Sequence, residues 1–293
     1  MPELPDITVY RDALDARVRG QVLTRVRLLN PFLLRTAVPP IADAEGRRVL
    51  GVHRLGKRIV LALEDELFLI LHLMIAGRLR WLQGTKPPAR ITLAVFEFEH
   101  GTLAFTEAGT KRRASLHFVR GADALATFDP GGIDVLETDE SAFSARLVLE
   151  NHTLKRALTE PHLFSGIGNA YSDEILHRAR LSPLLLTHAL KADDAKRLFA
   201  AARAVLTEWT ARLRAQAGKA FPENVTAFHP EMAVHGKFGE PCPVCGAPVQ
   251  RIVYAENECN YCARCQNGGL ILKDRALSRL LHKSWPRSID ELG

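Results

Sequence analysis

Between residues 22 and 118, apolar and polar positions alternate in short runs that predict β-strands. Glycines and polar turns such as Glu64-Asp65-Glu66 separate the runs, and no helical pattern intervenes. We therefore expect a β-sandwich or a barrel in this region. Seven strands are predicted: Val22–Leu29, Arg48–His53, Arg58–Leu63, Leu67–His72, Arg78–Leu82, Ile91–Phe98 and Leu103–Thr106.

The pattern is helical on both sides of this region. Ahead of it, Val9, Leu14 and Val18 share one face of a short amphipathic helix that ends before Gly20. After it, the composition changes at Asp129-Pro130-Gly131-Gly132, which we take as a domain boundary. The predicted helices are Thr8–Arg19, a helix with Ser141 as its N-cap that runs through Glu150, Leu154–Thr159, Ala170–Arg180 and Ala192–Ala217 with Gly218 as its C′ residue.

The composition indicates a globular protein with a polyanionic partner. The chain has 293 residues, enough for two domains, and a formal net charge of +6. Charged residues interrupt the first apolar positions, so no signal peptide is predicted. No apolar run approaches the roughly 18 residues of a membrane span. These features favour a cytoplasmic protein that does not enter membranes.

The cysteines form the most specific local motif. Sixteen residues separate Cys242-x₂-Cys245 from Cys262-x₂-Cys265, a spacing typical of a four-cysteine zinc ribbon. Cys259 creates a competing pair with Cys262, but the resulting gap of thirteen residues is short for this motif. We therefore expect one structural zinc ion on the first four cysteines, with Cys259 as a small apolar filler.

The first six residues, Met1-Pro2-Glu3-Leu4-Pro5-Asp6, can support covalent chemistry. An α-amine has a pKa near ~8, against ~10.4 for lysine, so more of it is unprotonated at neutral pH. Once methionine is removed, the secondary amine of Pro2 can attack an aldehyde-like carbon and form an iminium. Glu3 can then move protons at the same atom. The alternative interpretation is a disordered, proline-rich terminus.

Three further turns carry groups that suit phosphates. Lys57 lies in the turn Gly56-Lys57-Arg58, and Arg112 and Arg113 lie in a basic loop after a predicted strand. Each also fits an ordinary solvated turn. Gly166-Ile167-Gly168-Asn169 opens a predicted helix, where backbone N–H groups and the helix dipole attract anions. Glycine permits close approach of a phosphate, and Asn169 adds an amide donor.

Taken together, these motifs resemble those of the formamidopyrimidine-DNA glycosylase and endonuclease VIII family over roughly residues 1–270. They are Pro2-Glu3-Leu4-Pro5, Gly56-Lys57, Gly166-Ile167-Gly168-Asn169-Ala170-Tyr171 and Cys242 to Cys265. The resemblance implies an α+β multidomain protein. Its expected parts are a catalytic β-sandwich with an N-terminal helix at 1–130, a helix–two-turn–helix domain at 131–235, a zinc hairpin at 236–272 and an extension at 273–293, where Ala276–His282 is a predicted helix.

The resemblance also implies roles for individual residues. Pro2 matches the nucleophile that attacks C1′ of a damaged nucleotide, and Glu3 matches its acid/base partner. Lys57 matches a lysine that contacts phosphate and assists β-elimination. The expected DNA contacts are Asn169, Gly168, Lys155, Arg112 and Arg113; Glu174 matches an acidic supporting residue; and Cys242, Cys245, Cys262 and Cys265 match the zinc ligands.

Several positions depart from the family pattern. Asn257 stands where the zinc hairpin normally carries an arginine that grips phosphates and serves δ-elimination. Ile75 stands where a void-filling methionine is usual, the intercalating aromatic of the basic loop is missing, and Asp6 replaces a glutamate. We therefore expect strand cleavage mainly by β-elimination, unless Arg251 or Arg264 substitutes for the missing arginine.

The resemblance thus predicts a bifunctional DNA glycosylase with AP lyase activity, a monomer that acts in base excision repair on double-stranded DNA with a damaged base or AP site. A cytoplasmic, nucleoid-associated location is expected. The alternative is a protein of the same family that binds AP sites or damaged DNA with little base excision. The leucine of the N-terminal motif favours oxidised or ring-opened purines, and oxidised pyrimidines and bulky lesions stay open.

Overall fold

The computed structural model describes residues 1–109, 111–223, 225, 228–254, 257–274 and 286–292. The chain divides into two compact units. Met1–Pro130 and Trp209–Thr226 form the first unit, and Gly131–Glu208 and Ala227–Gly293 form the second. The long helix α6 (Ala192–Ala217) contributes residues to both units. The four-domain division expected from the sequence stays a prediction.

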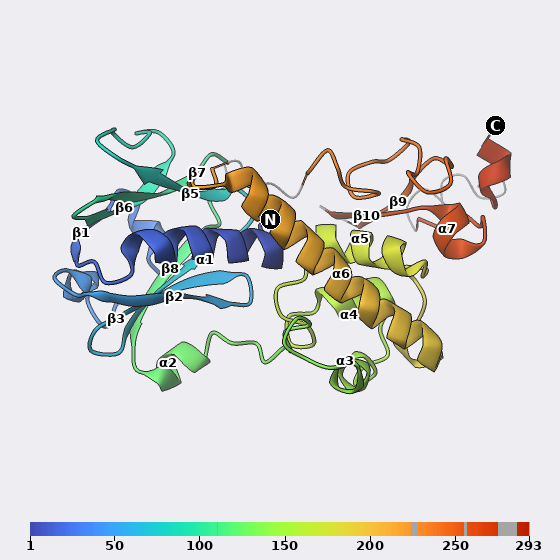
Figure 1. The fold of residues 1–293 in the computed structure, drawn as a ribbon, viewed down its shortest axis with the longest axis horizontal. Helices are drawn as coiled ribbons and strands as arrows, with labels where there is room; N and C mark the ends of the chain where they lie inside the picture. Colours follow the sequence, from blue (N-terminus) through green and yellow to red (C-terminus); the bar gives the residue numbers. More distant parts are fainter. Residues whose placement is uncertain (110, 224, 226–227, 255–256, 275–285, 293) are drawn as a thin grey trace. The chain divides into compact units, whose positions relative to one another are not determined.

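The first unit is a sandwich of two antiparallel four-stranded sheets (Figure 1). The apolar faces of both sheets contribute to one buried core. The α+β class with an N-terminal sandwich is therefore confirmed, and the barrel alternative is wrong. In spatial order, one sheet contains β1 (Leu23–Leu28), β6 (Thr92–Phe98), β7 (Gly101–Glu107) and β5 (Gly77–Leu82), and the other contains β2 (Val49–Leu55), β3 (Arg58–Leu63), β4 (Leu67–His72) and β8 (Ser115–Arg120).

Strand β8 was missed in the sequence, where only seven strands are predicted. Its apolar residues Leu116 and Phe118 are buried and alternate with the half-exposed Ser115 and His117. The alternation is present, but it directly follows a run of basic residues that obscures its start. The short helix α2 (Ala122–Ala126) follows and packs against β8.

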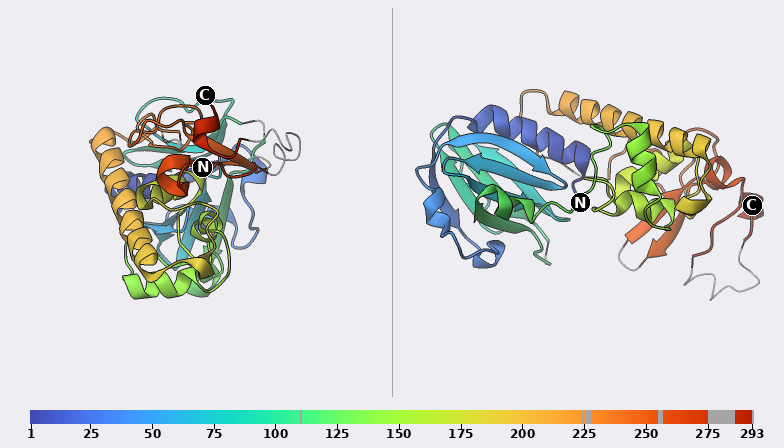
Figure 2. Two further views of the ribbon diagram at one scale, coloured as in Figure 1. Left: turned by 90° about the vertical axis from the view of Figure 1, so that its right-hand side faces the viewer. Right: turned by 90° about the horizontal axis from the view of Figure 1, so that it is seen from below.

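Helix α1 (Leu4–Val18) begins four residues earlier than predicted. Glu3 is its N-cap and forms a reciprocal capping box with Asp6, and a proline occupies the first turn, where a missing N–H costs nothing. The helix packs against β2 and β3 (Figure 2). It buries the side chains of Tyr10 and Leu14 in the core. The start of the chain is thus fixed in the fold, and the disordered-terminus interpretation is wrong.

The segment after α6 belongs to the same unit and packs on α1. Phe221 and Val225 join the core of the sandwich, and the rings of Tyr10 and Phe221 lie 5.7 Å apart. Arg214, near the end of α6, forms an ion pair with Asp12 of α1 at 2.6 Å. Gly218 follows the helix with a φ of +55°, as predicted for a C′ residue.

The second unit combines a helical part with a zinc-ribbon hairpin. Phe143 packs against Phe164 and Phe199, with ring centroids 4.8 and 5.2 Å apart. The N-cap of α3 is Asp139, whose carboxylate accepts from Ala142 N at 2.8 Å, so the prediction of Ser141 was wrong. The elements of the second unit are α3 (Glu140–Leu147), α4 (Leu154–Thr159), α5 (Asn169–Ala179), the first part of α6, β9 (Gln250–Tyr254), β10 (Asn257–Tyr261) and α7 (Ala263–Asn267).

The end of the chain returns to this hairpin. Ile271 N donates to Arg287 O at 2.9 Å, and Ile289 packs into the small apolar core beneath the cysteines. The helix predicted over Ala276–His282 lies outside the described residues.

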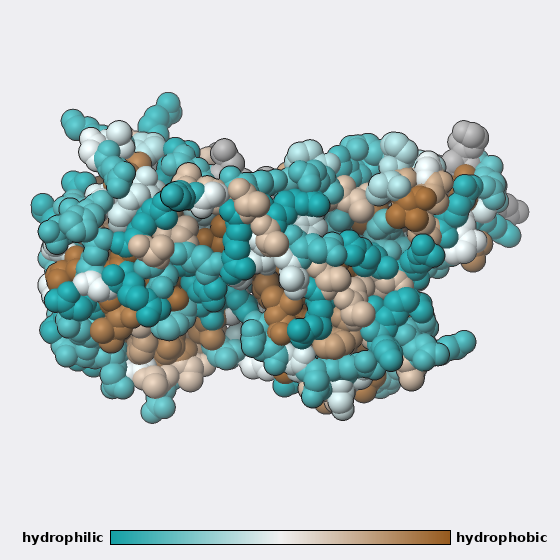
Figure 3. Space-filling view, viewed as in Figure 1, coloured by the Kyte–Doolittle hydropathy of each residue, from teal (hydrophilic) through white to brown (hydrophobic). Residues whose placement is uncertain are grey.

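The surface is predominantly hydrophilic on the face drawn in Figure 3, in keeping with the 25% of charged residues. Within the described residues, no helix combines the length and the apolar character that crossing a membrane would require.

Candidate active site, phosphate-binding turn and metal centre

The N-terminal turn buries two carboxyl groups side by side. Pro2 is buried, and Glu3 and Asp6 are only 2% and 1% exposed. Glu3 N donates to Asp6 Oδ2 at 2.8 Å, whereas Asp6 Oδ1 is buried without a hydrogen-bond partner among the described atoms. Burial, reinforced by the negative charge of Glu3, raises the pKa of Asp6 to about 7 against the opposing hydrogen bond from Glu3 N.

The α-amine of the chain lies in the same environment. In this structure it belongs to Met1, and burial lowers its pKa below the ordinary value of 8.0. The charges of Arg78 and Lys57 act in the same direction, and those of Glu3 and Asp6 oppose them. More of the amine is therefore unprotonated at neutral pH than in a solvated terminus, which is what a nucleophile requires.

The two basic groups reach this turn from the ends of strands. Lys57 lies in the two-residue turn of the β2–β3 hairpin, where Gly56 takes a φ of +59° and Leu55 pairs with Arg58. Arg78 is the second residue of β5, and its guanidinium donates to Gly77 O at 2.7 Å. Sequence reasoning found Lys57 but missed Arg78, because nothing in its local pattern marks it.

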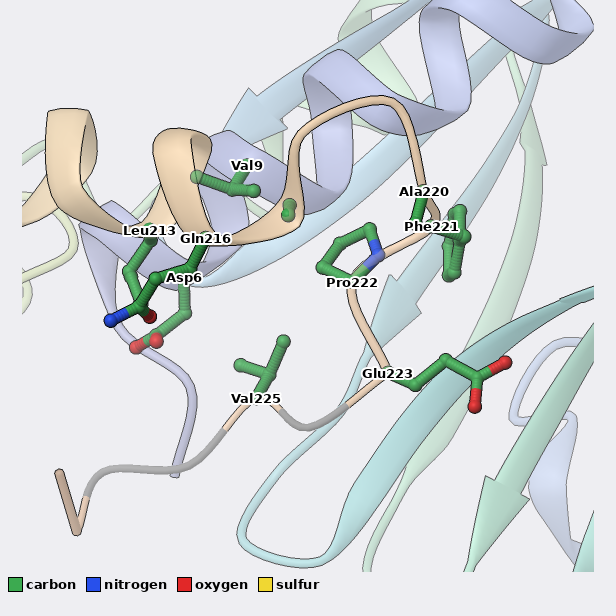
Figure 4. A pocket seen from close by; sticks show the side chains of 10 residues that line it. Asp6, Val9, Leu213, Gln216, Ala220, Phe221, Pro222, Glu223 and Val225 are labelled. Carbon is green, nitrogen blue, oxygen red and sulfur yellow. The ribbon is translucent and has the colours of Figure 1, made fainter.

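A pocket of about 480 Å³ opens beside the N-terminal turn within the first unit. Figure 4 shows Asp6 and Val9 of α1, Leu213 and Gln216 near the end of α6, and the segment after that helix around it. The walls are mostly apolar, and Asp6 supplies a buried carboxyl. Such a combination suits a flat organic ring with a few polar atoms.

Two loops of the sandwich present the residues expected to contact DNA. Ile75 is 54% exposed in the turn after β4, beside Met74, whose φ of +52° is a strained conformation for a residue with a Cβ. Arg112 and Arg113 are also exposed, and Arg112 donates to Arg90 O at 3.2 Å. The positions of these side chains permit contact with a large ligand.

The phosphate-binding turn lies in the second unit, at the start of α5. Gly168 is the N-cap, and Asn169 is the first helical residue. Asn169 Nδ2 donates to Glu258 O of β10 at 2.8 Å, which ties the turn to the zinc-ribbon hairpin. The turn opens a helix as the sequence predicted, and phosphate binding at this N-terminus stays a prediction.

Lys155, expected to contact DNA, is largely buried within the second unit, and that contact stays a prediction. It is 9% exposed, and Nζ donates to Asn169 O at 2.6 Å and to Asp173 Oδ1 at 2.5 Å. These two bonds use two of the three N–H donors of the ammonium group, so a contact with a phosphate would have to use the third. Glu174 is equally committed, since its carboxylate accepts from three consecutive backbone N–H groups, of Ala233, Val234 and His235, at 2.8 to 3.0 Å.

Four cysteines converge at the end of the second unit. The sulfur atoms of Cys242, Cys245, Cys262 and Cys265 all lie within 4.8 Å of one another. A tetrahedral zinc site with Zn–S bonds of ~2.3 Å places its sulfurs about 3.8 Å apart, so the donor set fits zinc. Cys259 is buried on β10 and is not part of the cluster. His177 Nε2 lies 3.3 Å from Cys242 Sγ, a contact that the sequence did not suggest.

The two arginines that could replace the missing one each have a partner in the second unit. Asn257 is exposed at the start of β10. Arg251 stacks on Phe238 at 4.3 Å and pairs with Glu258. Arg264 pairs with Asp290 near the end of the chain. Both guanidinium groups are therefore engaged elsewhere within the zinc module.

Three family models match the chain along most of its length. They describe the N-terminal domain of formamidopyrimidine-DNA glycosylase at residues 1–114, its helix–two-turn–helix domain at 132–216, and a zinc finger found in this enzyme and in isoleucyl-tRNA synthetase at 239–268. Together with the N-terminal turn and the cysteine cluster, these matches define the class as DNA glycosylases with AP lyase activity.

Individual relatives indicate the same family as the family models. The formamidopyrimidine-DNA glycosylase of Thermus thermophilus is 34% identical over 278 residues, which cover 92% of this chain and all of the relative. That of Acidothermus cellulolyticus is 32% identical over 281 residues, covering 91% and 97%. The chain therefore belongs to the formamidopyrimidine-DNA glycosylase family, and it is a DNA glycosylase of base excision repair with one structural zinc ion.

Solved structures give the same result. The crystal structure of MutM from Thermus thermophilus superposes with a TM-score of 0.77 at 34% identity, covering 90% of this chain and 98% of that one. A mutant of the Lactococcus lactis enzyme in complex with DNA containing Fapy-dG superposes with a TM-score of 0.80 at 25% identity, covering 91% and 100%.

Proposed function

We propose that Pro2 is the nucleophile, once removal of Met1 makes it the first residue of the mature chain. Its nitrogen attacks C1′ of an extruded nucleotide while the bond from C1′ to the base breaks, and the base leaves with a proton. The C1′–O4′ bond of this adduct then breaks as O4′ takes up a proton, which opens the sugar ring and leaves an iminium between C1′ and the Pro2 nitrogen. The iminium acidifies the proton on C2′. Loss of that proton breaks the C3′–O bond, which nicks the strand by β-elimination.

The remaining residues divide between proton transfer and binding. Glu3 moves protons at the sugar, and Lys57 holds the adjacent phosphate and assists elimination. Gly168 and Asn169 bind a backbone phosphate at the start of α5, and Arg112 and Arg113 add contacts to the strand. Ile75 fills the space that the extruded base leaves, and the pocket beside Asp6 receives that base. The cysteines hold zinc in a structural site.

One observation supports this assignment above the others. The α-amine of Met1, whose pKa is lowered mainly by burial, lies next to the buried Pro2 and Glu3, so removal of Met1 would leave the amine of Pro2 beside the same buried carboxyl. A DNA-binding protein without covalent chemistry has no need of an amine in that environment.

We further propose that strand cleavage stops mainly at β-elimination. The reason is that Asn257 carries no charge, while Arg251 and Arg264 are held by Phe238, Glu258 and Asp290. The variant Asn257→Arg tests this proposal. It should raise the share of δ-elimination product on a denaturing gel several-fold, with Asn267→Arg in α7 as the matched control. An unchanged product ratio would contradict the proposal.

A non-excising protein that only binds AP sites is the second candidate, because Ile75 and Asn257 depart from the family pattern. Borohydride trapping on an AP-site duplex separates the two. The active enzyme is expected to become covalently attached to DNA, and Pro2→Gly to lose most of that adduct. If the wild type binds the duplex without being trapped, the second candidate is favoured. If the variant is trapped as well as the wild type, Pro2 is not the nucleophile. Intact mass spectrometry shows beforehand whether Met1 has been removed.

The substrate class is proposed to be oxidised or ring-opened purines in double-stranded DNA. The apolar pocket beside Asp6 supports a flat base, and several of the structural relatives were solved with lesion-containing DNA. A cleavage panel of duplexes with single defined lesions tests the choice. We propose that the enzyme acts as a monomer on chromosomal DNA in the cytoplasm.

A further inference from the structure

A buried carboxylate in the second unit connects four separate segments of the chain. Asp173 of α5 has a fully buried side chain. Its Oδ1 accepts from Lys155 Nζ of α4 at 2.5 Å. Its Oδ2 contacts His235 Nδ1 at 2.8 Å and accepts from Asn260 N of β10 at 3.2 Å. Both oxygens are therefore occupied, and a cation and an imidazole face the same carboxylate.

The contact with Asp173 determines which nitrogen of His235 carries a proton. A carboxylate only accepts hydrogen bonds, so Nδ1 is the donor in this pair. The His235 side chain is 4% exposed, and its ring stacks on Phe228 with centroids 5.5 Å apart. The backbone N–H of His235 donates to Glu174 at 3.0 Å. Three contacts therefore hold the imidazole in place: the backbone hydrogen bond to Glu174, the ring stacking on Phe228 and the hydrogen bond from Nδ1 to Asp173.

The same network reaches the phosphate-binding turn. Lys155 Nζ, besides its bond to Asp173, donates to Asn169 O at 2.6 Å. The side-chain amide of Asn169 donates to Glu258 O of β10. Two residues further along the same strand, Asn260 N donates to Asp173. Displacement of Asp173 would therefore change both the backbone and the amide of Asn169.

We propose that His235 is a positioning residue for the phosphate-binding turn. By donating to Asp173, it fixes the carboxylate that holds Lys155 against the Asn169 carbonyl. Without that donor the carboxylate loses a hydrogen bond in a buried site, which favours rotation away from Lys155. This inference rests on the proposed binding of a DNA phosphate at Asn169.

Two substitutions separate the donor from the ring. His235→Asn keeps an N–H donor at about the place of Nδ1 but loses the ring that stacks on Phe228. His235→Phe keeps a ring but loses the donor. With a duplex containing a tetrahydrofuran AP-site analogue, we expect His235→Phe to raise Kd roughly tenfold, as loss of a hydrogen bond to a charged group would. His235→Asn should stay within about twofold of the wild type on the same reasoning.

A readout of the chemical step distinguishes positioning from a general defect. The borohydride-trapping rate of His235→Phe at saturating AP-site duplex should fall by less than its affinity does. Circular dichroism and zinc content identify any variant that fails to fold, and His162→Phe, at an exposed histidine, is the matched control. If His235→Phe binds like the wild type, or His235→Asn is as weak as His235→Phe, the inference is wrong.

A second variant tests the pathway through Lys155. Lys155→Gln should weaken binding by a similar factor, and the double variant with His235→Phe should be no weaker than the worse single variant, because both remove the same support. Additive losses would contradict the inference. A wild type that does not bind the duplex would overturn the proposed function itself, whereas wild-type binding with an unchanged His235→Phe overturns only this inference.

Discussion

The N-terminal turn of the first unit and the phosphate-binding turn of the second both bury carboxyl groups, but the two turns differ in how far the carboxyl oxygens are hydrogen-bonded. Asp173 and Glu174 use their oxygens for hydrogen bonds to a lysine, an imidazole and backbone N–H groups. Asp6 leaves Oδ1 buried and unpartnered, and its pKa rises to about 7. Buried polar atoms normally have partners, so Asp6 is the exception to be explained.

The same contrast extends to the whole of each unit. Among the described residues, the buried side-chain atoms without a hydrogen-bond partner are Asp6 Oδ1, Arg58 Nε, Arg80 Nε and His117 Nδ1, and all four belong to the sandwich. The second unit satisfies its buried charges and so serves as a rigid scaffold. The first unit retains unsatisfied buried groups, and one of them, Asp6 Oδ1, lies in the turn where we propose the chemistry, where such a group favours reactivity at the expense of stability.

The largest expected effect comes from removing a zinc ligand of the scaffold. Cys262→Ala should lower the zinc content from about one ion per chain to none and unfold the hairpin, since structural zinc contributes roughly 10 kcal/mol to small zinc modules. Cys259→Ala, three residues away on β10, should keep the zinc and lose only about 1 to 2 kcal/mol of stability from the small cavity. Zinc analysis and chemical unfolding check both. Equal zinc loss would mean that Cys259 is a ligand.

The scaffold also shows how far a sequence can be interpreted. The cysteine spacing and the Gly168-Asn169 turn are local patterns, and the structure places both as expected. Lys155 and His235 carry no such pattern. The carboxylate that they share is 18 residues from Lys155 and 62 residues from His235. Only the packing of α4, α5 and the hairpin brings these groups together, so the sequence predicted neither the contact of Lys155 with Asp173 nor a role for His235.

The active-site turn was anticipated in a similar, incomplete way. Pro2 and Glu3 are recognisable because they are adjacent in sequence. The start of α1 at Leu4 depends on a capping box between Glu3 and Asp6, which makes the turn rigid. Arg78 and the unpartnered oxygen of Asp6 follow from tertiary packing. Their effect on the α-amine was therefore not predictable from the motif.

A smaller but specific effect is expected at Glu3. Glu3→Gln keeps the shape of the side chain and removes its charge, so base excision should slow by about 10²- to 10⁴-fold, the usual contribution of a general acid or base. The melting temperature should change little, because Gln can still accept in the capping box. Single-turnover excision and thermal unfolding measure the two quantities, with the exposed Asp123→Asn in α2 as the control. A large loss of stability without a loss of excision rate would mean that Glu3 has a structural role and no role in the chemical step.

The smallest effect should be a gain of stability at Asp6. Because the folded-state pKa of Asp6, about 7, lies above its ordinary value of 3.8, the folded state holds this proton more tightly than the unfolded state. The contribution of Asp6 to wild-type stability should therefore be fully present below pH ~4 and be lost as pH rises to about 7. Asp6→Asn removes this titration while its amide oxygen can still accept from Glu3 N. The shift corresponds to about 4 kcal/mol at most, and relaxation of the buried site reduces this to an expected gain of about 2 kcal/mol.

Urea unfolding of the wild type and Asp6→Asn at pH 5 and pH 8 measures this gain, because titrations elsewhere cancel in the difference between the two proteins. The advantage of the variant should be larger at pH 8. A difference that does not change with pH would mean that Asp6 keeps an ordinary pKa and is as well satisfied as Asp173. In that case the two turns would not differ in electrostatic strain, and the reactivity of the N-terminal turn would have to come from the α-amine alone.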